Sequence, residues 1–159
     1  MSSEPILVLY AEDSGDDAFL MQRAFNKVKF PGTLKLVPHG QAAIEFLRDA
    51  AGEGGGETVR PTLALLDVKM PLAGGIETLE WIRAHEPWKT MPAVMLTSSS
   101  QEIDVEMAYQ RGADSYLVKP SNLDDFRELV AALAKFCLEG RKDVLLSLPG
   151  AIPPPKRKR

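Results

Sequence analysis

The chain has 159 residues, of which 45% are hydrophobic and 26% are charged. This length suits one folded domain with a short extension, and the composition excludes a fully disordered chain, a collagen and a coiled coil. The net charge of −3 is unevenly distributed, because four of the 19 basic residues occupy the last four positions; the other 15 face 22 acidic residues, a balance of −7. An acidic body is a poor partner for nucleic acid backbones.

Five short apolar runs predict five β-strands. In chain order they are residues 6–10, 34–37, 63–66, 94–96 and 116–118. The first, third and fourth runs are almost continuously apolar, which is typical of strands covered on both faces in a parallel sheet. The second run alternates in character, which indicates a less buried edge strand.

Segments with helical spacing lie between and after these runs. Their apolar stripes are Ala18, Met21, Phe25 and Val28; Ile76, Leu79 and Ile82; Ile103 and Met107; and Leu123, Phe126, Val130, Leu133 and Cys137, with residues 41–50 as a further candidate. Ser121 or Asn122 is suited to cap the last helix. Strand and helix thus alternate five times, which predicts an α/β fold with a doubly wound five-stranded parallel sheet.

Three segments fall outside this alternation. Residues 52–57 are glycine-rich and predict a flexible surface loop. Residues 138–150 are expected to extend the last helix, although Gly140 could interrupt it, and residues 151–159 are expected to form a disordered, proline-rich basic tail. The tail sequence resembles a nuclear localisation patch, and it could also dock on an acidic partner or a membrane surface, or simply be solvated.

Three further features narrow the class of protein. The single cysteine, Cys137, excludes an internal disulfide and a cysteine-rich metal site, and its place on an apolar stripe favours a packing role. The apolar runs are far shorter than the ~20 residues of a membrane helix. The N-terminal residues lack the pattern of a signal peptide, so we expect a cytoplasmic protein that does not contact the membrane.

Polar side chains follow four of the predicted strands. Glu12 and Asp13 follow the first strand, Asp67 the third, Thr97 the fourth and Lys119 the fifth. In a doubly wound sheet these strand ends meet at the ligand-binding edge. Three carboxylates repel one another unless a cation joins them, and oxygen ligands of this kind suit Mg²⁺. With a fixed ammonium and a hydroxyl donor, the set predicts phosphoryl-transfer chemistry.

The same stretches resemble the receiver domain of two-component response regulators. They are residues 6–13, residues 66–71 with Gly75, residues 95–98 and residues 112–120. The resemblance covers residues 4–137, which we interpret as one receiver domain, and it implies a flavodoxin-like fold. It also implies that Asp67 is the phosphoacceptor for a phosphohistidine on a sensor histidine kinase.

The resemblance assigns roles to the remaining site residues. It implies that Asp13 and Asp67 ligate Mg²⁺ directly, Lys69 through its backbone carbonyl and Glu12 through a bound water. Thr97 and Lys119 would contact the phosphoryl oxygens, and a cis peptide bond before Pro120 would aim the lysine. Tyr116 occupies the position of the aromatic switch residue, through which the signal reaches the output face of the fourth helix, fifth strand and fifth helix.

A closer resemblance is to small single-domain regulators of bacterial phytochrome kinases. It rests on residues 97–104, residues 119–126 and the extension that ends near Pro149. It implies a phytochrome kinase as the donor, a downstream phosphotransfer protein as a further partner, and a homodimer as one possible assembly. The protein would not be an enzyme in its own right, although it would assist its own phosphorylation and dephosphorylation.

Two other functions stay open on the sequence. An aspartyl-phosphate-type phosphohydrolase uses a similar aspartate, Mg²⁺ and lysine, but it needs a second aspartate where this chain has Lys69. That lysine departs from the acidic or amide residues common at this position, and it could screen a phosphoryl group or face solvent. The other alternative is a non-phosphorylated dimerising scaffold.

Overall fold

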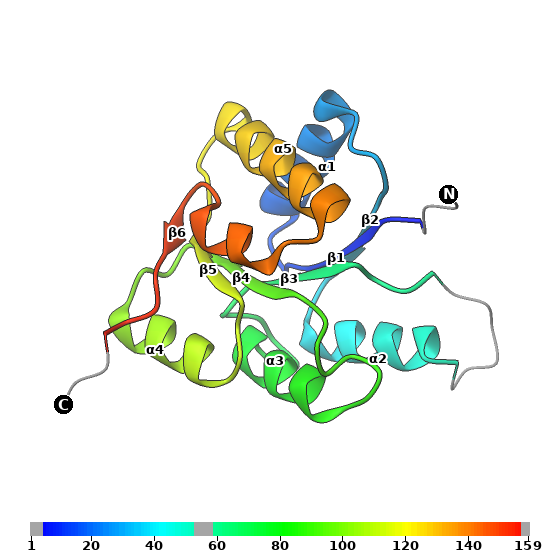
Figure 1. The fold of residues 1–159 in the computed structure, drawn as a ribbon, viewed down its shortest axis with the longest axis vertical. Coiled ribbons are helices and arrows are strands. Elements are labelled where there is room, and N and C mark those ends of the chain that lie inside the picture. The colour runs from blue at the N-terminus through cyan, green and yellow to red at the C-terminus, as the bar shows by residue number, and fades with distance from the viewer. Residues whose placement is uncertain (1–4, 53–58, 157–159) are drawn as a thin grey trace.

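The computed structural model describes residues 5–52 and 59–156, and it contains one six-stranded sheet flanked by helices (Figure 1). The strands are β1 (Leu7–Ala11), β2 (Thr33–Val37), β3 (Leu63–Leu66), β4 (Ala93–Thr97), β5 (Ser115–Val118) and β6 (Ala151–Ile152). The helices are α1 (Gly15–Val28), α2 (Gly40–Ala50), α3 (Gly75–Ala84), α4 (Glu102–Gln110), α5 (Leu123–Glu139) and the 3₁₀ helix η1 (Lys142–Ser147). Most of the predicted glycine-rich loop lies outside the described residues.

The sheet has the strand order β2-β1-β3-β4-β5-β6, and its first five strands are parallel. Helices α1 and α5 cover one face, and α2, α3 and α4 cover the other (Figure 1). The predicted doubly wound, flavodoxin-like class is therefore confirmed, although the sheet has six strands and not the predicted five. Strands β2 and β3 lie on opposite sides of β1, so the strand order reverses at β1. In this architecture the ligand site lies at the carboxyl ends of the strands beside such a reversal.

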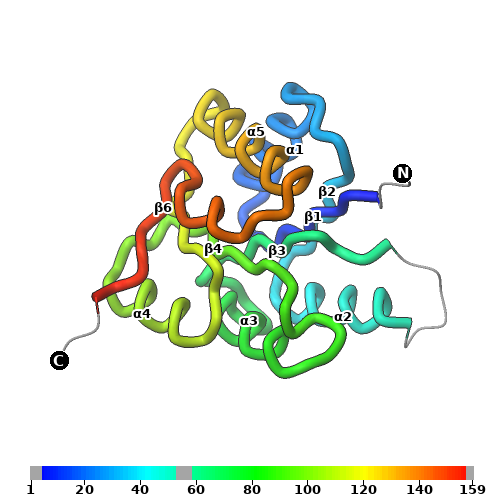
Figure 2. The backbone as a smooth tube through the Cα atoms, viewed as in Figure 1, coloured from blue at the N-terminus to red at the C-terminus, as the bar shows by residue number. Residues whose placement is uncertain are grey.

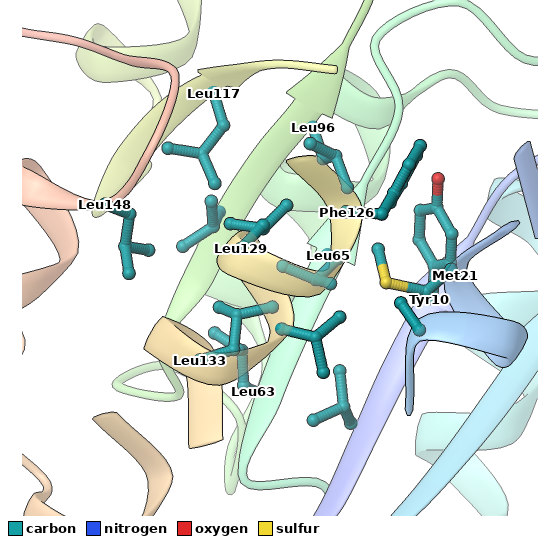
Figure 3. Close-up of a cluster of buried hydrophobic side chains, with 14 of the residues drawn as sticks. Tyr10, Met21, Leu63, Leu65, Leu96, Leu117, Phe126, Leu129, Leu133 and Leu148 are labelled. Atoms are coloured by element: carbon teal, nitrogen blue, oxygen red, sulfur yellow. The ribbon is translucent and has the colours of Figure 1, made fainter. Parts of the chain in front are cut away.

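The burial of each strand explains its sequence pattern. Every residue of β1, β3 and β4 is buried, because helices cover both faces, and these are the strands with continuous apolar runs. Strand β2 alternates between exposed and partly buried residues before its buried last residue, Val37, and its predicted edge position is confirmed. Figure 3 shows the core on the α5 side, where Leu65 and Leu96 from the sheet meet Phe126 and Leu129 from α5.

The chain after α5 differs from the prediction. Helix α5 ends at Glu139 because Gly140 adopts a left-handed φ of 73° and donates its N–H to the Phe136 carbonyl at 2.7 Å. Of residues 138–150, only Leu138 and Glu139 belong to the helix, and residues 140–150 do not extend it. They form η1 and a turn instead, and Leu145 and Leu148 pack into the core.

The predicted disordered tail is also wrong at its beginning. Ala151 and Ile152 form β6, which pairs antiparallel with β5 along an edge that would otherwise have unpaired backbone groups. The Tyr109 hydroxyl of α4 donates to the Ile152 carbonyl, and Figure 2 shows this red segment running beside α4. Residues 157–159 of the basic tail lie outside the described part, and the boundary of the receiver unit at residue 137 stays a prediction.

Among the helices that the structure describes, none combines the length and apolar character needed to cross a bilayer.

The thiol of Cys137 is expected to react slowly. Its side chain projects from α5 and packs against the core, and burial raises the pKa of the thiol to about 11. Because the thiolate is the reactive form, alkylation by iodoacetamide in mildly alkaline buffer should be at least about tenfold slower than for an exposed cysteine. Intact-mass kinetics would measure this rate, and unfolding in urea should restore the ordinary rate. Equal rates for folded and unfolded protein would contradict the prediction.

Candidate functional site

The carboxyl ends of β1, β3 and β4 bring three polar side chains into a buried position. Glu12 is 4% exposed, Asp67 5% and Thr97 2%. Acidic side chains are rarely this buried unless they have charged partners. The three residues follow or end fully buried apolar strands, so the strands fix their backbone positions.

An acidic group forms where β1 and β3 end side by side. Oxygen atoms from Glu12, Asp13 and Asp67 all lie within 4.8 Å of one another. Glu12 and Asp67 are buried, whereas Asp13 is exposed, so the group opens to solvent at Asp13. Three carboxylates at this spacing fit a hard divalent cation, which prefers oxygen ligands and offsets their mutual repulsion.

Lys119 lies at the centre of the carboxylates. Its ammonium nitrogen is 2.8 Å from Asp67 Oδ2 and 2.8 Å from Asp17 Oδ2, and it also pairs with Glu12 Oε1. Burial alone would lower the pKa of Lys119, but hydrogen bonds to the three carboxylates outweigh burial and raise it. The ammonium is therefore a permanent positive charge in the site.

The peptide bond before Pro120 differs from what the resemblance implies. Within the described residues the cis peptide bond is Glu86–Pro87, so the bond between Lys119 and Pro120 is trans. The lysine nevertheless reaches Asp67 directly.

Glu12 is held by two further donors. The Tyr10 hydroxyl donates to Oε1 at 2.9 Å, and the backbone N–H of Ser14 donates to Oε2 at 3.2 Å. Burial raises the pKa of the Glu12 carboxyl to about 7, although the hydrogen bond from Lys119 acts against it and neighbouring Asp67 adds to it. The position of the Glu12 carboxyl group is thus fixed by its donors, and its negative charge is stabilised by the cation beside it.

A chain of hydrogen bonds runs from Thr97 to β5. The backbone N–H of Ser99 donates to Thr97 Oγ1 at 3.3 Å, and the Tyr116 hydroxyl donates to the Ser99 carbonyl at 2.9 Å. The Ser99 hydroxyl donates to Asp104 Oδ2 at 2.6 Å, which ties the loop to the first turn of α4. Tyr116 is fully buried, and burial raises the pKa of its hydroxyl.

The loop after β3 is packed tightly against Asp67. The Lys69 side chain is exposed, and its backbone N–H lies 3.4 Å from Asp67 Oδ1. Gly75 begins α3, and a Cβ atom there would lie 2.1 Å from the Asp67 carbonyl oxygen. The loop also adopts positive φ values at Leu72 and Ala73, whose carbonyls accept the first N–H groups of α2.

The structure places the predicted residues Glu12, Asp13, Asp67 and Lys119 in one cluster and puts Thr97 at the end of the neighbouring strand. Sequence reasoning missed Asp17, although the pattern Ser14-x-x-Asp17 at the start of α1 marks a helix cap. It also missed the hydrogen bond from the Ser99 hydroxyl to Asp104. Neither contact has a signature in local periodicity.

Comparison with known proteins identifies the family. The sequence profile of the response regulator receiver domain matches residues 8–131, most of the chain. The chain therefore belongs to the response regulator receiver domain family, the receiver class of two-component signalling, and the predicted family is confirmed.

Particular relatives are similar over nearly their whole length. The response regulator Rcp1 of Synechocystis sp. is 34% identical over 139 residues, which are 87% of this chain and 92% of that protein. The probable methanogenesis regulatory protein FilR2 of Methanothrix harundinacea is 34% identical over 86% of each chain.

Solved structures give the same grouping. The Mn²⁺-bound form of Rcp1 superposes with a TM-score of 0.73 at 33% identity, covering 86% of this chain and 97% of that one. The phosphorylated cyanobacterial phytochrome response regulator RcpA superposes with a TM-score of 0.76 at 29% identity, covering 86% and 96%.

Proposed function

We propose that the protein is a phosphoacceptor module in which Asp67 takes a phosphoryl group from a phosphohistidine of a sensor histidine kinase. One observation supports this most directly: the buried Asp67 carboxylate lies 2.8 Å from the Lys119 ammonium and within 4.8 Å of the Glu12 and Asp13 oxygens. A nucleophilic carboxylate between a fixed cation and a cation-binding group suits phosphoryl transfer, where positioning and charge neutralisation supply most of the catalysis.

The chemistry follows from these positions. An oxygen of Asp67 attacks phosphorus, the bond from phosphorus to the imidazole nitrogen breaks, and its electron pair stays on the imidazole. Lys119 offsets the charge on the transferred oxygens, and the Thr97 hydroxyl donates a hydrogen bond to one of them. Attack by water on the resulting acyl phosphate returns Asp67 and inorganic phosphate, so the same residues assist both steps.

The proposed metal is Mg²⁺. Asp13 and Asp67 would bind it through their carboxylates, Lys69 through its backbone carbonyl and Glu12 through a water. A bound divalent cation supplies charge neutralisation at the phosphoryl oxygens.

The output would pass through Tyr116. Its hydrogen bond to the Ser99 carbonyl links β5 to the loop that begins at Thr97, so a movement of Thr97 toward a phosphoryl group would disturb the ring. We propose that this changes the face made by α4, β5 and α5, where a second copy of the chain or a downstream phosphotransfer protein would bind.

The similarity to RcpA, a phosphorylated phytochrome response regulator, supports a phytochrome kinase as the donor. Because sensor kinases make phosphohistidine from ATP, we propose the cytoplasm as the place of action.

Replacing Asp67 tests the function directly. Wild-type protein incubated with acetyl phosphate and Mg²⁺ should gain the mass of one phosphoryl group, and chelation of the metal should prevent the gain. Asp67→Asn should show no gain, because the amide is not a nucleophile, whereas Asp49→Asn on the exposed side of α2 should match wild type. Intact-mass spectrometry measures all four samples.

Two other outcomes would contradict the proposal. An unmodified wild-type protein would favour the scaffold alternative, and continuous turnover of a simple phosphate ester would favour a phosphohydrolase.

A further inference from the structure

We propose that Asp17 is a positioning residue for phosphoryl transfer, which keeps the Lys119 ammonium beside Asp67 when a divalent cation engages the other carboxylates around it. This inference rests on the proposed function of Asp67 and adds a residue to its site.

Three carboxylates surround the Lys119 ammonium, and a lysine has three N–H donors. Asp17 Oδ2 and Asp67 Oδ2 each lie 2.8 Å from the nitrogen, and Glu12 Oε1 is the third partner. The Lys119 side chain is 7% exposed and that of Asp17 is 28% exposed, so the pair is largely shielded from water. The ion pair is therefore stronger than one on an open surface.

Asp17 differs from the other two partners in one respect. Glu12 and Asp67 also belong to the acidic group that fits a cation, whereas Asp17 does not. A cation on that group competes with Lys119 for Glu12 and Asp67, but not for Asp17. The ion pair between Asp17 and Lys119 is thus the contact that can persist both with and without a bound cation.

The start of α1 explains why the Asp17 carboxylate is available. Ser14 caps the helix, and its hydroxyl accepts the Asp17 N–H at 3.3 Å. In a full capping box the acidic residue at this place would accept the N–H of the cap residue. Here Glu12 accepts the Ser14 N–H instead, so the Asp17 side chain is free to reach Lys119 across 102 positions of the sequence.

The geometry indicates the direction of the effect. Fixing a lysine side chain in one conformation costs rotamer entropy. Because the ion pair with Asp17 already holds Lys119 in place, part of this entropy cost does not have to be met when a phosphoryl group binds. Asp17 accepts a hydrogen bond from one N–H of the Lys119 ammonium, and Asp67 accepts from another. Asp17 therefore does not compete with a phosphoryl group on Asp67 for the same donor. Removing its charge should weaken phosphoryl binding rather than strengthen it.

Beryllofluoride, an analogue of the phosphoryl group, tests this on the full chain in the presence of Mg²⁺. Asp17→Asn should bind it roughly tenfold more weakly than wild type, the scale of one lost charge-assisted hydrogen bond. Asp16→Asn is the matched control, because Asp16 is the neighbouring exposed acid in the same helical turn, and its affinity should stay within about twofold of wild type. Fluorine NMR measures the bound fraction.

A second measurement uses Mg²⁺ alone and follows the nitrogen-15 signal of the Lys119 ammonium. In wild type and Asp16→Asn this signal should persist through saturation with Mg²⁺. In Asp17→Asn it should broaden or vanish as Mg²⁺ binds, while the backbone amide spectrum shows an intact fold. A purely structural role for Asp17 would not make the loss depend on Mg²⁺.

Two results would overturn the inference: beryllofluoride affinity in Asp17→Asn equal to or tighter than in Asp16→Asn, or a Lys119 signal that persists in both variants. Failure of the proposed function is distinct. In that case wild type itself would bind no beryllofluoride and accept no phosphoryl group, whereas the Lys119 signal under Mg²⁺ would still report on Asp17.

Discussion

Gly75→Ala should lower the free energy of unfolding by about 3 kcal/mol or more. The added Cβ would lie 2.1 Å from the Asp67 carbonyl oxygen and 2.7 Å from Met95 Cε. The methionine could move, but the carbonyl belongs to the backbone at the end of a buried strand. The clash therefore has to displace α3 or the Asp67 backbone. Urea denaturation followed by circular dichroism measures the loss.

Gly15→Ala is the matched control. Gly15 is also the first residue of a helix, but a Cβ there would meet nothing within 4 Å. We expect a small gain in stability of about 0.5 kcal/mol, because alanine restricts the unfolded chain more than glycine does. Equal denaturation midpoints for the two variants would contradict the packing argument.

Lys119→Met should reduce the rate of phosphorylation by acetyl phosphate by at least about 100-fold, because no positive side chain would then face the transferred oxygens. The same change should tighten Mg²⁺ binding, since it removes a cation that pairs with Glu12 and Asp67. Intact-mass kinetics and isothermal titration calorimetry measure the two effects. If the phosphorylation rate and the Mg²⁺ affinity both fell, the result would contradict this prediction and indicate a collapsed site.

The stability of Lys119→Met should depend on Mg²⁺. Without the metal, the unpaired carboxylates should cost about 3 kcal/mol, as is usual when one partner of a buried ion pair is removed. Saturating Mg²⁺ should return a large part of this loss, because the ion binds the folded protein. Lys135→Met, which changes an exposed lysine on α5, should leave stability and phosphorylation close to wild type.

Much of the fold could be predicted because its signals are local. The continuous apolar runs around Leu9, Leu65 and Met95 result from burial on both faces of the sheet, and burial acts on each strand separately. The rule that parallel strands share one carboxyl edge predicts from the sequence that Glu12 and Asp67 lie together. Periodicity and topology were sufficient for these features.

Other features could not be predicted because they depend on three-dimensional contacts. Strand β6 has two residues, too few to show a period, and it forms because the edge of β5 needs backbone partners. The pair between Asp17 and Lys119 depends on the relative placement of α1 and β5. The sequence marks Gly140 as a possible interruption of the last helix, but the packing of Leu145 from η1 into the core is a tertiary contact that periodicity does not show.

The two margins of the sheet are protected in different ways. At one margin, β2 carries the exposed charge of Lys35 at its centre, which discourages another chain from adding a strand there. At the other, Gly150 and β6 occupy the hydrogen-bonding groups of Val118 and its neighbours. A protease that removed the residues from Gly150 onward would therefore leave the backbone N–H and C=O groups of β5 unpaired along the sheet edge. The clipped protein would then be prone to aggregate by intermolecular strand pairing.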